Sequence, residues 1–108
     1  MAKITYNDKD NIVNNVIQLK KEFRRTSGTS TFIHKQVYHK DNWYIYKAGP
    51  NNYEVFKEKI SNTVQYIDGK ISVTKQQKVK YPSDEDFGNW AWSCSSYYQA
   101  LNIIEHRK

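Results

Sequence analysis

The stretch VQYIDGKISV, residues 64–73, limits the possible folds more than any other part of the sequence. Its Asp68-Gly69 dipeptide is typical of a two-residue type I′ turn, whose twist matches that of two paired antiparallel strands. This turn brings alternate apolar side chains of both strands onto one face, as a half-buried hairpin requires. The second strand is expected to run on until Pro82 ends it. The pairs expected across the hairpin are Val64 with Val73, Tyr66 with Ile71 and Ile67 with Lys70.

Three further strands are predicted before this hairpin, at residues 31–38, 43–48 and 53–60. These runs are rich in Tyr, Ile, Val, Phe and Thr, which are favoured in strands. The segments HKDN and AGPNN between them have the composition of turns. The sequence therefore predicts a three-stranded antiparallel meander.

A helix is predicted towards each end of the chain. Across residues 8–25, apolar side chains recur at three- and four-residue steps, which is the period of a helix with one buried face. In the segment SSYYQALNIIEHRK, Ser96 and Gln99 match a capping box, which indicates the start of a helix. The apolar stripe of this second helix consists of Tyr97, Ala100, Leu101 and Ile104.

Together these elements predict an α+β fold in two layers. We expect an N-terminal helix, a five-stranded antiparallel sheet made of the meander and the hairpin, and a C-terminal helix. Both helices are expected to pack on one face of the sheet. The length of 108 residues favours a single domain over residues 1–108.

The stretch DEDFGNWAWSCSS, residues 84–96, combines acids, two tryptophans and the lone cysteine. In an extended chain Trp90 and Trp92 share one face, and side chains of their size are usually buried, so we expect both to close the core. The acids before them are expected to cap a helical turn or to pair with strand lysines. The alternatives are docking of a basic partner and a metal site, for which further ligands would be needed nearby. These acids are Asp84, Glu85 and Asp86.

Signatures of catalysis, metal binding and membrane insertion are missing from the sequence. There is no G-x-S-x-G motif, no local signature around Cys94, and no zinc-ligand spacing among the three histidines. We therefore expect no enzyme activity, no cofactor and no metal. No apolar run approaches the ~20 residues that span a bilayer, and the N-terminus lacks a signal-peptide pattern. With a lone cysteine, this favours a cytoplasmic protein without a membrane partner.

The basic charge of the chain points to a polyanionic partner. The formal net charge is +6, and residues 1–83 carry 15 Lys and Arg against 7 Asp and Glu. Such a balance is typical of proteins that bind nucleic acid. Fourteen of the 17 basic residues are Lys, which suits attraction to the phosphate backbone better than readout of bases.

Aromatic side chains are interleaved with these cations. Tyr44 and Tyr46 share one face of the second meander strand, opposite to Trp43. If Trp43 points inward, both tyrosines are exposed beside Lys35 and Lys57, as a platform on which bases can stack. The alternative is that the tyrosines only fill the strand. The residues expected to attract the nucleic-acid backbone are Lys20, Lys21, Arg24, Arg25, Lys35, Lys47, Lys78 and Lys80.

We therefore expect a small, non-enzymatic binding protein. Its size and its high content of Lys, Asn and Ile resemble those of accessory proteins of phages and mobile elements. It is predicted to bind RNA or DNA, or a nucleic-acid–protein complex, through a basic, tyrosine-rich surface. The alternative is an anti-CRISPR-like inhibitor or adaptor that blocks a host defence nuclease complex through protein contacts alone, using exposed aromatic residues and the acids at 84–86. The sequence favours neither RNA nor DNA as the partner, and it does not indicate an oligomeric state.

Overall fold

The computed structural model describes residues 12–13, 16–67 and 70–108 of the chain. The chain falls into two compact units, which are described separately. The larger unit consists of Lys20–Glu58 and Pro82–Lys108, and the smaller consists of Lys59–Tyr81 with the described part of Met1–Leu19. That residues 1–108 form a single domain stays a prediction.

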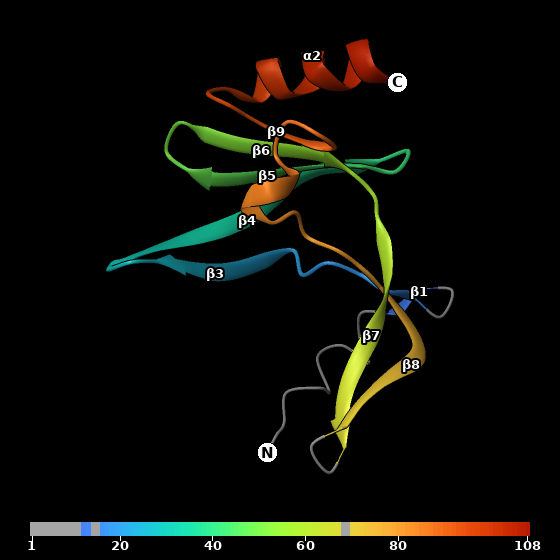
Figure 1. Cartoon of the computed structure of the whole chain (residues 1–108). Helices are drawn as coiled ribbons and strands as arrows, with labels where there is room; N and C mark the ends of the chain where they lie inside the picture. Colours follow the sequence, from blue (N-terminus) through green and yellow to red (C-terminus); the bar gives the residue numbers. More distant parts are fainter. Residues whose placement is uncertain (1–11, 14–15, 68–69) are drawn as a thin grey trace. The chain divides into compact units, whose positions relative to one another are not determined.

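The larger unit is an antiparallel sheet with one helix across a face (Figure 1). In spatial order, its five described strands are β3 (Glu22–Ser27), β4 (Ser30–Lys40), β5 (Trp43–Gly49), β6 (Asn52–Lys57) and β9 (Ala91–Cys94). The helix α2 (Tyr97–Arg107) packs against β5, β6 and β9. The predicted α+β class, with a five-stranded antiparallel sheet and a C-terminal helix, is confirmed.

The meander is the part of the sheet that the sequence predicts best. β4, β5 and β6 overlap the three predicted strands and pair in the expected antiparallel order. Asp41 and Asn42 join β4 to β5 with φ angles of 54° and 69°. A two-residue type I′ turn needs such left-handed values at both positions, and Asp and Asn adopt them more readily than other residues apart from glycine. The turn predicted at HKDN is therefore a tight hairpin turn.

One face of the sheet is covered by α2, and we call it the helix face. Its core consists of Trp43, Ile45 and Val55 from the sheet with Ala100 and Ile104 from α2, and Tyr97 and Leu101 are partly buried against them. The four helix residues recur at three- and four-residue steps, as a helix with one buried face requires. The predicted apolar stripe of the C-terminal helix is confirmed.

The N-terminus of α2 is capped by Ser96. Its hydroxyl accepts a hydrogen bond from the backbone N–H of Gln99 at 3.1 Å, as the sequence predicts. The second bond of the predicted capping box is shifted by one residue, because Gln99 Oε1 accepts from the backbone N–H of Ser95 at 2.9 Å.

Replacing Ser96 by Ala is expected to lower the free energy of unfolding by about 1 kcal/mol, because the N–H of Gln99 loses its acceptor. Urea denaturation of both proteins measures the difference. Ser93→Ala is the control, since Ser93 is exposed in β9 and its loss should cost no more than about 0.5 kcal/mol. Equal losses in the two variants would contradict the capping role.

The opposite face of the sheet is also buried, and we call it the aromatic face. Tyr44, Tyr46 and Phe56 are at most 1% exposed. The Phe56 ring stacks at 5.3 Å from Tyr44 and at 5.8 Å from Tyr46, and Trp90 meets it edge-on at 6.2 Å. The sheet thus buries both faces at β5 and β6, which accounts for the unbroken buried run at 43–46.

The two tryptophans of the segment 84–96 lie on opposite faces of the sheet, so the prediction that they share one face is wrong. Trp90 lies on the aromatic face, whereas Trp92 lies on the helix face, 6.2 Å from Trp43. Trp90 precedes β9 and follows the 3₁₀ turn η1 (Asp84–Asp86), where its backbone N–H donates to the carbonyl of Asp86 at 3.2 Å. Because Trp90 precedes the strand, the alternation of side chains along β9 does not predict its face. Both tryptophan rings contribute to the core, as expected.

The predicted N-terminal helix over residues 8–25 is not found. Its described residues include strands instead, and the prediction is wrong for them. Phe23 is half-buried between exposed neighbours in β3, which is the two-residue period of a strand. Four of the apolar residues before it are β-branched, and such residues favour strands over helices; they are Ile12, Val13, Val16 and Ile17. These earlier strands are β1 (Ile12–Val13) and β2 (Val16–Ile17), while 8–11 and 14–15 lie outside the described residues.

The smaller unit contains the predicted hairpin, made of β7 (Ile60–Ile67) and β8 (Lys70–Val79). Its register is confirmed, and the turn residues Asp68-Gly69 lie outside the described residues. The observed pairs include Val64 with Val73, Tyr66 with Ile71 and Ile67 with Lys70.

The hairpin does not extend the five-stranded sheet, so its predicted place in that sheet is wrong. Among the described strands it belongs to a separate sheet of order β1-β2-β8-β7, in which β2 runs parallel to β8. The free edge of β6 is occupied by β9, whose Trp92 pairs with Val55. A long-range pairing of this kind leaves no local signal in the sequence.

Candidate binding surface of the β3–β4 hairpin

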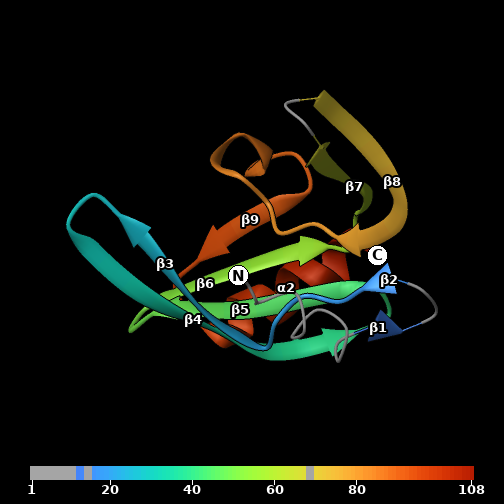
Figure 2. The ribbon, with the colours of Figure 1, turned by 90° about the horizontal axis from the view of Figure 1, so that it is seen from below.

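The β3–β4 hairpin projects past the ends of the neighbouring strands (Figure 1, Figure 2). Its outer part, residues 30–34 of β4, pairs with β3 alone, because pairing with β5 begins at Lys35. Two large apolar side chains are exposed on this projecting part, Phe32 at 44% and Ile33 at 52%. Exposed apolar side chains on a projecting hairpin make it the first candidate for binding a partner.

Each of these apolar side chains has an arginine beside it. The register pairs Arg25 with Phe32 and Arg24 with Ile33. Successive residues of a strand point to opposite faces, so the hairpin carries one arginine–apolar pair on each face. Arginine and aromatic side chains are the types most enriched at binding hot spots.

The pair of Arg24 and Ile33 continues into a basic surface on the part of the helix face next to β3. Lys35 and Lys47 are register partners on this same face, and both are exposed. Glu22 Oε1 lies 3.6 Å from Lys35 Nζ, an exposed ion pair that contributes little to stability. We call Arg24, Ile33, Lys35 and Lys47 the open sheet face.

The pair of Arg25 and Phe32 borders a pocket of about 390 Å³ on the aromatic face. We call it the His34 pocket. His34 is 4% exposed, and its ring stacks against Phe23 at 5.0 Å. The walls of the pocket are formed by Arg25, Thr26, Phe32, His34, Ala48, Gly49, Pro50, Asn52, Glu54 and Asp84.

The polar side chains of the His34 pocket differ in depth. His34 Nε2 lies 3.6 Å from Glu54 Oε1, and their side chains are only 6% and 12% exposed. Arg25 is more exposed, at 37%, and its Nη2 lies 3.8 Å from Asp84 Oδ1. The pocket therefore combines a buried carboxylate and imidazole with a guanidinium nearer to solvent.

Sequence reasoning singled out Arg25 but missed Phe32, Asn52 and Glu54 as site residues. One signal was available, because Phe32 and His34 alternate with Ile33 and Lys35 along a predicted strand. The contribution of β6 could not be found this way, since it depends on the pairing of three strands.

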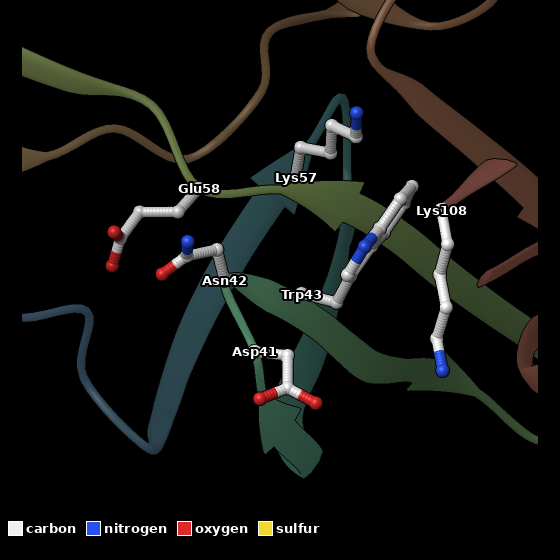
Figure 3. A pocket seen from close by; sticks show the side chains of 6 residues that line it. All are labelled: Asp41, Asn42, Trp43, Lys57, Glu58 and Lys108. Atoms are coloured by element: carbon white, nitrogen blue, oxygen red, sulfur yellow. The ribbon is translucent and has the colours of Figure 1, made fainter.

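A second hollow, of about 460 Å³, lies beside the β4–β5 turn and is lined by Asp41, Asn42, Trp43, Lys57, Glu58 and Lys108 (Figure 3). Lys57 Nζ lies 5.3 Å from the Trp43 ring centre, but this ring is only 4% exposed and offers no stacking surface. In Figure 3 the charged ends of the lysines and the acids point in different directions. The hollow therefore lacks convergent groups for one ligand.

The smaller unit carries a separate group of cations. Lys59, Lys78 and Lys80 are exposed and lie on one face of the β7–β8 hairpin, because Lys80 N–H donates to the carbonyl of Lys59 at 2.8 Å and Lys78 pairs with Ser61. We call these three residues the lysine face. Lys78 and Lys80 belong to the predicted set, and Lys59 was missed.

The predicted exposure of Tyr44 and Tyr46 is wrong, since both belong to the buried aromatic face. The Tyr46 hydroxyl donates to the carbonyl of Lys20 at 2.7 Å and accepts from Gln36 Nε2 at 2.9 Å. Burial raises the pKa of Tyr46 to about 12. Burial also raises the pKa of Tyr44, and the carboxylate of Glu58, 3.2 Å from its hydroxyl, adds to this. These rings therefore cannot act as a stacking platform in the folded protein.

Of the three acids of the turn, Asp86 has the capping role that the sequence favours. Asp86 Oδ2 accepts hydrogen bonds from the backbone N–H and the hydroxyl of Ser83, at 2.8 and 3.0 Å. Asp84 and Glu85 are exposed, and docking of a basic partner by them stays a prediction.

Two further sequence candidates, Lys20 and Lys21, have exposed side chains immediately before β3.

Cys94 is half-buried beside the helix-face core, and burial raises the pKa of its thiol. A raised pKa disfavours the reactive thiolate.

Comparison with known proteins gives no match: no protein-family model, curated protein or solved structure is significantly similar to this chain. In the part of the chain that the structure describes, no helix is long and apolar enough to cross a membrane. The same residues contain no group of three metal-ligating side chains. The β3–β4 hairpin and the lysine face are therefore the features from which a function can be inferred.

Proposed function

We propose that this chain is a non-enzymatic protein that binds single-stranded nucleic acid through the β3–β4 hairpin. Arg24, Arg25, Lys35 and Lys47 attract the phosphate backbone, and Phe32 provides the exposed ring on which a base stacks. The observation that carries the proposal is the pairing of Arg25 with Phe32 on a projecting hairpin. Binding of single strands combines a basic track with accessible aromatic rings in this way.

Exposure supports Phe32 in the role that the sequence suggested for Tyr44 and Tyr46. The Phe32 side chain is 44% exposed, whereas the two tyrosines are at most 1% exposed. A base can stack only on a ring whose face solvent can reach. Single strands are favoured over duplexes because their bases are free to leave the stack.

The lysine face supplies a second, purely electrostatic contact. Lys59, Lys78 and Lys80 are exposed. The strand β8, which contains Lys78, also contains Lys70 and Lys75. Lysines increase affinity for any polyanion and do not discriminate between bases. The composition of the chain resembles that of accessory proteins of phages and mobile elements. The proposal includes that the chain acts as such an accessory protein in the cytoplasm.

The test is binding of fluorescent single- and double-stranded RNA and DNA oligonucleotides at about 50 and 200 mM salt. The variant Arg24→Gln/Lys35→Gln/Lys47→Gln removes three charges from the open sheet face. We expect its logarithmic salt dependence for single strands to fall by about 2, since each lost phosphate contact removes about 0.7. No binding of any oligonucleotide at the lower salt concentration would overturn the proposal.

The matched control is Lys40→Gln/Lys57→Gln/Lys108→Gln, which removes the same charge from another part of the larger unit. These side chains are also exposed. A general effect of net charge would change both variants equally, whereas a located interface changes the first variant more. Equal salt dependences in the two variants would place the interface elsewhere.

A protein-binding inhibitor or adaptor is the second candidate, and the exposed apolar residues favour it. Phe32, Ile33 and Val37 are 38% to 52% exposed, and exposed apolar side chains that lie together also mark protein-binding surfaces. Such an interface would bind a host nuclease complex with little dependence on salt. Failure of oligonucleotide binding would favour this candidate.

A further inference from the structure

We propose that the His34 pocket binds a single nucleobase and prefers bases that carry an amino group over uracil. This inference rests on the proposed function and extends it from backbone attraction to base selection. The pocket volume of about 390 Å³ lies within the range of about 300–1,000 Å³ that is typical of small-ligand sites.

The exposed ring of Phe32 provides the stacking surface for the base. Phe32 lines the pocket, and its register partner Arg25 lines it as well. Ala48, Gly49 and Pro50 contribute small or apolar groups to the lining of the same pocket, and these leave room for a planar ring. A pocket lined by an aromatic ring and by small residues suits a flat, apolar-faced ligand.

The polar end of the pocket selects among the bases. The Glu54 carboxylate, whose side chain is 12% exposed, lies beside His34, and a carboxylate has acceptor capacity for several donors at once. Guanine, cytosine and adenine present an exocyclic amino group as a donor, whereas uracil presents carbonyl oxygens on both sides of its single ring N–H. A buried acceptor therefore favours the amino-bearing bases, as it does when an acidic side chain accepts from cytosine.

Arg25 is placed to hold the phosphate of the same nucleotide. Its side chain is 37% exposed, while those of His34 and Glu54 are nearly buried. Asp84 lies 3.8 Å from its guanidinium. An ion pair with so exposed a carboxylate contributes little to stability, so a phosphate can compete with Asp84 for the guanidinium. Base and phosphate thus have separate partners at different depths of one pocket.

The test uses 5′-monophosphates of guanosine, cytidine, adenosine and uridine, titrated into the protein and followed by two-dimensional NMR of backbone amides. We expect at least one amino-bearing nucleotide to bind roughly tenfold more tightly than uridine monophosphate. Phe32→Ala should weaken all four nucleotides roughly tenfold through the loss of stacking. Glu54→Gln should reduce the preference for amino-bearing bases, because an amide offers both a donor and an acceptor.

Tyr98→Ala is the matched control, since it removes an exposed aromatic ring from α2, outside the β3–β4 hairpin. It should leave nucleotide binding unchanged. Equal effects of Phe32→Ala and Tyr98→Ala, or equal affinity for all four nucleotides, would overturn the proposal. Binding of N-acetyl-arginine amide in place of nucleotides would also overturn it, because the pocket would then recognise an arginine of a partner protein.

These outcomes are distinguishable from failure of the proposed function. If oligonucleotides bind with the expected salt dependence and Phe32→Ala weakens them, but the four mononucleotides bind equally or not at all, only the pocket assignment is wrong. If no oligonucleotide binds, while mononucleotides bind in the predicted order, the pocket stands as a free-nucleotide site and the proposed function is wrong.

Discussion

Replacing Phe56 by Ala is expected to lower the free energy of unfolding by about 3–5 kcal/mol. Phe56 is fully buried between the rings of Tyr44 and Tyr46, with Trp90 against its edge. Truncation leaves a cavity that these large, stacked rings cannot fill without moving, so the lost contacts add to the lost burial of the ring. Urea denaturation followed by tryptophan fluorescence measures the change.

Phe32→Ala is the control for this prediction, because it removes the same atoms from an exposed position. Its expected cost is no more than about 0.5–1 kcal/mol. The two variants should therefore separate stability from binding: Phe56→Ala weakens the fold, whereas Phe32→Ala spares the fold and weakens stacking. A cost below about 1 kcal/mol for Phe56→Ala would contradict the two-faced core.

The predictions from sequence that succeeded depend on short-range signals. The hairpin of β7 and β8 follows from the alternation on both sides of Asp68-Gly69, and its observed register matches. The turn between β4 and β5 follows from two residues, Asp41 and Asn42, that tolerate left-handed backbone. The start of α2 follows from Ser96, whose side chain satisfies one of the free N–H groups of the first turn.

The predictions that failed required knowledge of which segments meet. Apolar residues from Ile12 to Phe23 fit helical spacing, but most of them are β-branched, and the pairing partners of β1, β2 and β3 decide for strands. β9 occupies the edge of β6 through a contact between residues about forty positions apart along the chain, as in Val55 with Trp92. Periodicity within one segment does not contain this information.

The candidate site also combines features that short-range signals predict with features that depend on which segments meet. The cations Arg24, Arg25, Lys35 and Lys47 are visible in the composition of the chain. The aromatic residue that is exposed for stacking cannot be predicted from the composition. Alternation separates the two faces of a strand but does not show which face another segment covers. Tyr44 and Tyr46 belong to a covered face, and Phe32 lies on the part of β4 that extends past β5.

Raising the pH from about 10 to about 12 is expected to reduce stability by roughly 2–3 kcal/mol through Tyr46 alone. Its pKa is raised to about 12 from an ordinary value of 10.0, and each unit of difference corresponds to about 1.4 kcal/mol. Below pH 10 the phenol is protonated in both states and its contribution is complete. Between the two values the unfolded state loses the proton while the folded state keeps it, so stability falls as the pH rises. Tyr44, whose pKa is raised in the same direction, adds to this loss.

The loss of stability at alkaline pH is measured by urea denaturation at several pH values above 8, with tyrosinate absorbance recorded in parallel. Tyr46→Phe should cost about 1 kcal/mol at neutral pH, because the hydrogen bonds to Lys20 and Gln36 are lost. Its stability should nevertheless fall less steeply above pH 10 than that of the unchanged protein, since one ionising group is gone. Tyr98→Phe, at a position that is 81% exposed, should leave the steepness unchanged. If Tyr46→Phe and the unchanged protein lose stability in parallel, then Tyr46 ionises freely in the folded state, and the aromatic face is open to solvent rather than buried.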